Sequence, residues 1–332
     1  MKNWEIYIEN FNYKELKIMT IRLYIVSIMF VLFFNVSSFS QKGQQIEQDF
    51  LAMKQYTVAL GTVVDDYISA GKTQLLQKKF VPIGSGLLTY TKYDTIVISS
   101  IVTAAHVIKY FIDNNLRSIF IRPSWADTIK ITDYFGIEIP LVNPDKSPNT
   151  FLYPEKNIDL GCVLMFPNYY DEVYINKFSK ETRKVFPFKS MTTPFLGDQV
   201  WVCGYPSHVE IETMNKFLYN VSTFKPGYIT WKPSENMTNE DLYHITLVES
   251  NATYGNSGGP VFALHEFLEL VGIVVGGYSE LDTVYVNGKP VFDPLSKKPM
   301  LTKSRSDISI IEKADYVKKL VEYVEKQINK TN

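Results

Sequence analysis

Short runs of β-prone residues separated by turn residues cover most of the chain, and this pattern predicts β-strands. The clearest runs are residues 86–90, 95–98, 118–121, 200–202, 227–231, 244–248 and 270–275. Many short strands joined by irregular loops are typical of an antiparallel barrel or sandwich. Asn287-Gly288 lies between two such runs and predicts a hairpin over residues 284–292. We therefore expect an all-β fold.

The spacing of apolar residues changes at both ends of this β-rich region. Between Gln44 and Tyr67 the pattern is mixed, which predicts a short helix leading into a strand. Near the end of the chain, apolar residues recur on one helical face with Lys and Glu between them. This spacing predicts a C-terminal α-helix from Ile311 to Ile328.

The segment from Leu23 to Val36 has the pattern of a secretory signal peptide, with Lys17 and Arg22 before it and small residues after it. The apolar run of about 14 residues is shorter than the ~20 that a membrane-spanning helix needs. We expect cleavage near Ser40-Gln41 and a secreted or periplasmic protein; an uncleaved membrane anchor is the alternative.

The expected division is an N-terminal extension with the signal peptide over residues 1–40 and a folded domain over residues 41–330. The segment before Met19 is long for a leader and carries acidic residues (Glu5, Glu9 and Glu15), so the initiator is either Met1 or Met19.

The composition indicates a globular protein and gives no sign of a nucleic-acid partner. Hydrophobic residues make up 45% of the chain, too many for a disordered protein. The net charge is −1 and no Lys/Arg block occurs, so nucleic acid is not an expected partner. The two cysteines, Cys162 and Cys203, lie in apolar runs and form either buried free thiols or one bridge. No metal-binding or cofactor motif occurs, and we expect neither.

Three short motifs carry residues suited to nucleophilic catalysis. They are residues 101–107 with His106, residues 157–161 with Asp159, and residues 255–261 with Ser257. Glycines around Ser257 permit an open turn where a substrate carbonyl can approach, and Ser257 is the candidate nucleophile. The N–H groups of Gly255 and Ser257 are candidates for an oxyanion hole. The alternative is a glycine-rich turn with an incidental serine.

His106 and Asp159 are the candidate base and orienting acid. Of the histidines at 106, 208, 244 and 265, only His106 ends an apolar strand beside small residues. It would take the proton of Ser257 and pass it to the leaving amine. The acids weighed for the third role are Asp113, Asp127, Asp133, Asp145, Asp159, Asp171 and Asp198. Asp159 is favoured because a carboxylate at the start of an apolar strand needs a partner.

The motifs TAAHV, NIDLG and GNSGGPVF, in this order, resemble those of chymotrypsin/trypsin-like serine peptidases. Within that family they resemble the bacterial HtrA-like and glutamyl-endopeptidase-like branches, here without a PDZ domain. Residues 84–88, 197–206 and 270–277 resemble further strands of the family. The resemblance implies two six-stranded antiparallel β-barrels with a C-terminal α-helix and an active site between the barrels. It also implies an exported serine endopeptidase that acts on protein or peptide substrates through an acyl-enzyme.

The resemblance also implies which residues bind substrate. Asn251 falls at the base of the specificity pocket, and its neutral side chain disfavours a preference for Arg or Lys. Val275, Gly276 and Gly277 fall on the strand that lines the pocket, and Val275 replaces a serine that helps to hold the triad acid. Asn256 replaces the aspartate that pairs with a newly cut N-terminus in zymogens, so we expect no such activation step. The alternative function is a catalytically silent trypsin-fold binding protein of the cell envelope.

Overall fold

The computed structural model describes most of the chain after residue 44. The described residues are 45–70, 73–93, 96–165, 186–187, 190–206, 221–234, 237, 239–250, 252–283, 285–286, 289–292 and 298–330. The expected signal peptide therefore lies outside the described residues. Among those that are described, no helix is both long enough and apolar enough to cross a membrane.

The chain divides into two compact units, Met1–Leu51 and Ala52–Asn332. The described part of the first unit is helical, and this helix runs over residues 45–56 as the mixed pattern predicted. The account that follows concerns the second unit.

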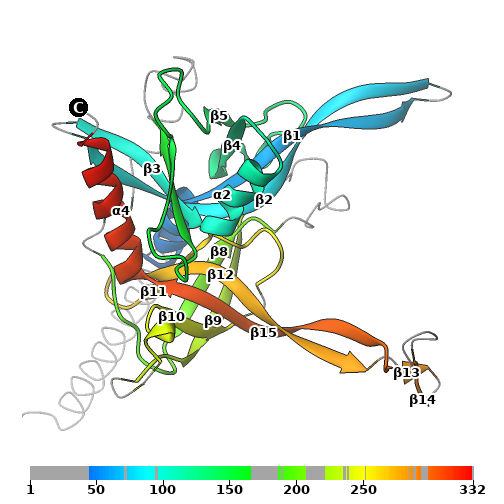
Figure 1. Cartoon of the computed structure of the whole chain (residues 1–332), viewed down its shortest axis with the longest axis vertical. Helices are drawn as coiled ribbons and strands as arrows, with labels where there is room; N and C mark the ends of the chain where they lie inside the picture. The colour runs from blue at the N-terminus through cyan, green and yellow to red at the C-terminus, as the bar shows by residue number, and fades with distance from the viewer. Residues whose placement is uncertain are drawn as a thin grey trace, which may run out of the picture. The chain divides into compact units, whose positions relative to one another are not determined.

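The first half of this unit is a curled seven-stranded antiparallel sheet with the strand order β5-β4-β1-β2-β3-β7-β6 (Figure 1). Its strands are β1 Thr57–Ala70, β2 Thr73–Tyr93, β3 Ile96–Ala104, β4 Ser118–Pro123, β5 Ile137–Pro140, β6 Thr150–Leu152 and β7 Leu160–Met165. Helix α2, Ala105–Asp113, and the short 3₁₀ helix η1, Ser124–Thr128, connect strands of this sheet. Beyond the sheet, β1 and β2 continue as a two-stranded ribbon.

This first half differs from the expected six-stranded barrel because its two edges do not share a ladder. The segments next to β5 and β6 are joined by the bridge between Val142 and Pro148 and by Asn149. Its backbone N–H donates to the Leu141 carbonyl (3.0 Å) and its side-chain Nδ2 donates to the Pro140 carbonyl (2.9 Å). Pro140, Pro144 and Pro148 occupy this region, and proline has no N–H to donate to a ladder. The prolines thus explain why no continuous ladder between β5 and β6 closes the curled sheet.

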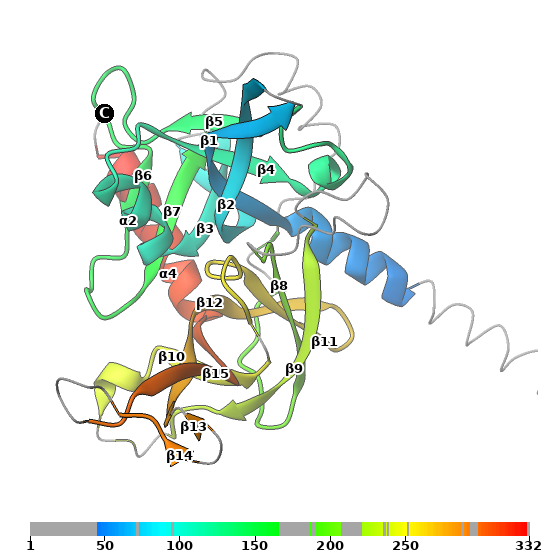
Figure 2. The same cartoon turned by 90° about the vertical axis from the view of Figure 1, so that its right-hand side faces the viewer.

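The second half is a closed six-stranded barrel with the order β10-β15-β12-β11-β8-β9 (Figure 2), which confirms the predicted second barrel. Its strands are β8 Gln199–Gly204, β9 Thr223–Trp231, β10 Ile245–Glu249, β11 Pro260–Leu264, β12 Leu268–Thr283 and β15 Leu301–Lys313. The short 3₁₀ helix η4, Glu240–Leu242, precedes β10. Small β-branched side chains dominate the barrel interior, including Val200, Val202, Val248, Val261 and Val271.

Two predictions about the end of the chain are borne out, one with a shifted boundary. The predicted hairpin is present, because β13, Tyr285–Val286, pairs antiparallel with β14, Lys289–Pro290. The predicted C-terminal helix is α4, Ala314–Ile328, and it packs against β2, β7 and β12. It begins three residues later than expected. Ile311 belongs instead to β15, where it pairs with Thr246 and Val274 and fills the barrel core.

Candidate active site

His106 stands at the junction between β3 and α2. Strand β3 ends at Ala104, and α2 buries Val107, Ile108 and Phe111 in the core of the first sheet. His106 points away from this buried face, and 47% of its side chain is exposed. The packing of its neighbours fixes the backbone while the ring stays accessible.

Asp159 lies beside His106 because β3 and β7 run antiparallel with Ala104 opposite Leu160. Its carboxylate is anchored twice: the His106 N–H donates to Oδ1 (2.9 Å), and Oδ2 lies 2.5 Å from His106 Nδ1. The Ala105 N–H donates to the Asp159 carbonyl (3.0 Å). An ionised carboxylate only accepts hydrogen bonds, so this contact places the ring proton on Nδ1 and leaves Nε2 free to accept one.

Other candidate aspartates make different contacts or lie outside the described residues. Asp171 lies outside the described residues, Asp145 binds Ser147, and Asp198 accepts from the Phe195 N–H. Within the described part of the chain, Asp159 is the acid that contacts His106.

Ser257 lies in the turn before β11 and is fixed through its backbone to both halves of the unit. The Ser85 N–H of β2 donates to the Ser257 carbonyl (2.7 Å). On the barrel side, the Gly258 N–H donates to the Val274 carbonyl (2.6 Å), and the Val274 N–H donates to that of Gly259 (2.9 Å). These bonds hold the candidate nucleophile turn, residues 255–259, against β2 and β12.

Gly258 allows this turn to approach the histidine strand. Its φ of +84° lies in the left-handed region, which side chains other than hydrogen disfavour. A Cβ at this position would lie 2.0 Å from Thr103 Oγ1 and 2.1 Å from the Ser85 carbonyl oxygen. The backbone next to Ser257 therefore touches β3 only three residues before His106.

The structure does not join all three candidate triad side chains. Both His106 and Ser257 are described, and no hydrogen bond connects them, whereas His106 and Asp159 are in direct contact. In the absence of substrate, nucleophile–base bonds are often long and tighten only when substrate binds.

The two candidate oxyanion-hole N–H groups donate no hydrogen bond to the described residues. Neither the Gly255 N–H nor the Ser257 N–H has an acceptor among the described residues. Gly255 has a φ of +90°, and its carbonyl accepts from the buried Ser85 Oγ (2.6 Å). With the carbonyl held on Ser85, both N–H groups remain able to donate to a substrate oxygen.

Asn256 is buried, but packing rather than hydrogen bonding holds its side chain. Within the described structure, neither Oδ1 nor Nδ2 has a hydrogen-bond partner. A Cβ on Gly204 would lie 2.8 Å from Oδ1, so the amide packs directly against this glycine. A neutral hydrogen bond from Ser85 to the Gly255 carbonyl holds the turn instead.

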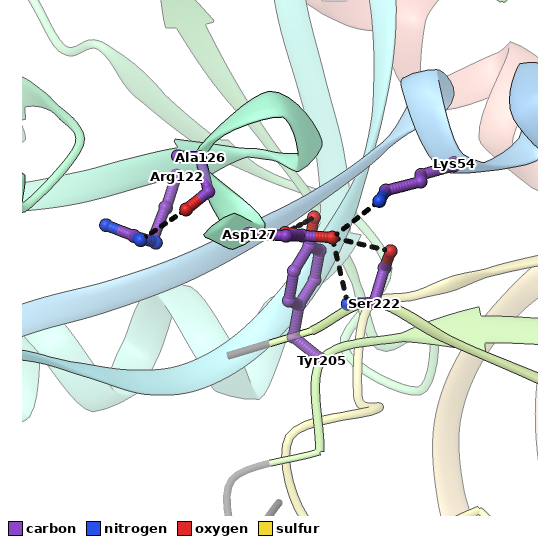
Figure 3. A network of polar contacts seen from close by, with 6 residues as sticks. All are labelled: Lys54, Arg122, Ala126, Asp127, Tyr205 and Ser222. Carbon is purple, nitrogen blue, oxygen red and sulfur yellow. Dashed lines mark hydrogen bonds and ion pairs between the residues drawn. The ribbon is translucent and has the colours of Figure 1, made fainter. Parts of the chain in front are cut away.

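Within the second unit, a polar network around the buried Asp127 connects Lys54, Tyr205 and Ser222 (Figure 3). Lys54 Nζ lies 3.1 Å from Asp127 Oδ2, while Tyr205 Oη and Ser222 Oγ donate to the two carboxylate oxygens (3.2 and 3.1 Å). Burial raises the pKa of Asp127, and the Lys54 charge and the hydrogen bonds lower it. The Tyr205 N–H in turn donates to Ser85 Oγ (2.8 Å), so the network reaches the nucleophile turn.

Comparison with known protein families places the chain in one of them. Residues 95–291, more than half of the chain, match the family described as Trypsin. The chain belongs to the trypsin-like serine peptidases. No curated protein matches its sequence.

Solved structures related to this trypsin-family chain are distant. The MamO protease domain from Magnetospirillum magneticum is 12% identical, with 81% of this chain and 97% of that chain covered and a TM-score of 0.42. The inactive Ser343Ala form of Rv3671c from M. tuberculosis H37Rv is 12% identical, with coverages of 83% and 89% and a TM-score of 0.42. The HtrA-type protease AlgW with a decapeptide is 13% identical, with coverages of 84% and 66% and a TM-score of 0.40.

The residues expected to bind substrate in this trypsin-family chain are only partly described. Asn251 lies outside the described residues. Val275 is half-buried and packs against the apolar core of the first sheet. Gly276 and Gly277 lie on β12 beyond Ile273, where its pairing with β11 ends. On one edge of β12 both glycines pair with β15, Gly276 with Ile310 and Gly277 with Ser309. Added Cβ atoms there would meet nothing closer than 3.7 and 3.4 Å, so the glycines leave space at this part of the strand.

Sequence reasoning missed two residues that support this site. Ser85 lies in a motif that resembled the family, but nothing in the sequence showed that its hydroxyl binds Gly255. The helix predicted from Ile311 to Ile328 includes Glu312, but Glu312 lies in β15, where it accepts the Asp159 N–H (2.9 Å). The sequence signal for Glu312 was its position as a charged residue directly after Ile310 and Ile311.

The described residues contain no cluster of three or more His, Cys, Asp or Glu side chains that could hold a metal ion. Cys162 and Cys203 are both buried free thiols, so the interpretation without a bridge is confirmed. Burial raises the pKa of the Cys162 thiol to about 12.

Proposed function

We propose that the protein is an exported serine endopeptidase that hydrolyses peptide bonds through Ser257, His106 and Asp159. The contact between His106 and Asp159 carries the proposal, because it leaves Nε2 as the only ring nitrogen able to accept a proton. Family membership implies peptide substrates.

The proposed reaction begins when Ser257 Oγ attacks the substrate carbonyl carbon and His106 Nε2 takes the hydroxyl proton. The carbonyl oxygen becomes an oxyanion that the Gly255 and Ser257 N–H groups stabilise. His106 then gives the proton to the leaving amine as the C–N bond breaks and an acyl-enzyme remains. Water attacks this ester with His106 again as base, which releases the acid product and restores Ser257. Asp159 stabilises the imidazolium in both steps.

The open edge of β12 supports a peptide substrate. An extended peptide can pair with an unpaired strand edge through its backbone. From Val275 to Gly277, β12 pairs with β15 on one edge, while its other edge lies beyond the end of the pairing with β11, next to the nucleophile turn. The glycines leave space for substrate side chains.

Ester and peptide hydrolysis test this function. The mature chain should release product from an activated ester in an initial burst followed by slower turnover, which marks an acyl-enzyme. S257A should abolish the burst without changing the thermal unfolding temperature by more than a few degrees. A chain that binds peptides but shows neither burst nor turnover would be the silent binding protein instead.

Export is part of the same proposal and rests on the apolar segment from Leu23 to Val36. N-terminal sequencing of protein recovered from the periplasm or medium should give Gln41 or a neighbouring residue as the first. A full-length cytosolic protein would refute export, and a full-length membrane-bound protein would indicate the uncleaved anchor.

A further inference from the structure

A buried carboxylate lies directly behind the candidate triad acid. Glu312 on β15 is 1% exposed. Its Oε1 accepts the Asp159 N–H (2.9 Å), and its Oε2 lies 2.6 Å from His244 Nδ1. Glu312 belongs to the barrel, whereas Asp159 and His106 belong to the first sheet. The contact therefore links the two halves at the catalytic acid.

Every polar group of Asp159 has a partner, and Glu312 is the one supplied by the barrel. The Asp159 carbonyl accepts from Ala105, and both carboxylate oxygens contact His106. Both partners, Ala105 and His106, belong to the β3–α2 junction. The N–H bond to Glu312 fixes the Asp159 peptide from the opposite side, and the peptide determines where the carboxylate points.

A buried carboxylate at this position is electrostatically unfavourable. Burial, with a smaller effect from the Asp159 charge, raises the pKa of Glu312, and the Asp159 N–H and His244 lower it. A neutral acceptor would bind the same N–H without placing a second acid near Asp159. Costly buried groups of this kind concentrate at functional sites.

His244 completes the arrangement. It is 7% exposed, and its ring packs edge-on against Tyr316 with centroids 5.9 Å apart. Its carbonyl accepts the Lys313 N–H (2.9 Å), so the backbone on both sides of the pair is fixed. An ionised Glu312 only accepts, which places the ring proton on His244 Nδ1.

We propose that Glu312, oriented by His244, is a positioning residue that holds the Asp159 peptide so that its carboxylate stays aligned with His106 Nδ1. The proposal rests on the proposed function of the triad. It assigns Glu312 no contact with substrate. Loss of Glu312 should therefore impair the chemical step and leave substrate binding unchanged.

Two substitutions of Glu312 with side chains of similar size distinguish a hydrogen-bonding role from a packing role. E312M fills the same volume but accepts no strong hydrogen bond. E312Q keeps an acceptor for the Asp159 N–H and offers an N–H donor to His244 Nδ1, which accepts it in the other neutral tautomer of the ring. An orphaned buried N–H in E312M should lower kcat on the order of tenfold to a hundredfold, with KM within about twofold. E312Q should recover most of this loss. E269Q is the control, because it alters the His265–Glu269 pair (2.7 Å), which does not contact Asp159.

The proton on His106 Nδ1 gives an independent readout by NMR of the whole mature chain. Its low-field resonance should shift or broaden in E312M and remain near the wild-type position in E312Q and E269Q. Equal kcat in E312M and wild type, or equal losses in E312M and E312Q, would overturn the positioning role.

Failure of the proposed function would look different. A wild-type chain without hydrolytic activity refutes the peptidase, and the NMR comparison then decides the positioning role alone: an unchanged His106 resonance in E312M overturns it. If E312M does not fold, amide exchange of wild type decides. The Asp159 N–H should exchange as slowly as buried strand amides, and rapid exchange would refute the contact.

Discussion

Replacing Ser85 by alanine should weaken both the fold and the nucleophile turn. The buried Ser85 hydroxyl donates to the Gly255 carbonyl (2.6 Å) and accepts the Tyr205 N–H (2.8 Å). S85A leaves a buried N–H without an acceptor and a carbonyl without a donor. From typical values for such groups, we expect a loss of about 2–4 kcal/mol in the free energy of unfolding.

Activity should fall as well, because Gly255 supplies one of the two candidate oxyanion donors. If about 1.4 kcal/mol of the lost energy orders this donor in the transition state, kcat/KM falls roughly tenfold. The assays are urea unfolding and ester hydrolysis at saturating and limiting substrate.

T89V is the matched control for S85A. Thr89 lies on the same strand and face, is fully buried, and donates to the Phe186 carbonyl (3.1 Å) away from the site. T89V should lose about 1 kcal/mol of stability and keep wild-type kcat/KM. If S85A also keeps wild-type kcat/KM, Ser85 is a structural residue and the coupling to Gly255 is refuted.

Two further predictions concern Gly258 and Asp127. G258A should fail to fold or lose most of its stability, because the added Cβ would lie 2.0 Å from Thr103 Oγ1. G197A is the control: Gly197 has nearly the same φ (+85°) but open space around it, so this variant should lose only about 1–2 kcal/mol. Equal losses of the two variants in urea unfolding would refute the packing argument. Because burial raises the folded-state pKa of Asp127, its ionisation removes stability as pH rises from the unfolded value of 3.8 through the folded one. The stability advantage of wild type over D127N should therefore shrink with rising pH across that window, and an advantage that grows with pH would contradict the dominance of burial.

The sequence predicted the strands and the terminal helix because their periodicity is local. The start of α4 was misplaced because Ile311 fits a helical face as well as a barrel interior, and only its pairing with Thr246 and Val274 decides between them. The incomplete closure of the first sheet depends on where prolines meet across its edges, which a single-strand pattern does not contain.

The same distinction applies to the site. His106, Asp159 and Ser257 could be proposed from the sequence because each lies in a short motif whose neighbouring residues suit its role. The contact between Glu312 and Asp159 joins residues 153 positions apart and carries no local signature. The hydroxyl of Ser85 likewise acquires its role from Tyr205 and Gly255, which only the folded chain brings to it.

The central claim is that Ser257 is a nucleophile activated by His106. The most direct measurement is the mass of the mature chain after reaction with a fluorophosphonate, followed by mapping of the modified peptide. We predict one adduct, on Ser257, with none in S257A and a rate lowered by orders of magnitude in H106A. No adduct on wild type, or an adduct on another residue that persists in S257A, would contradict the account.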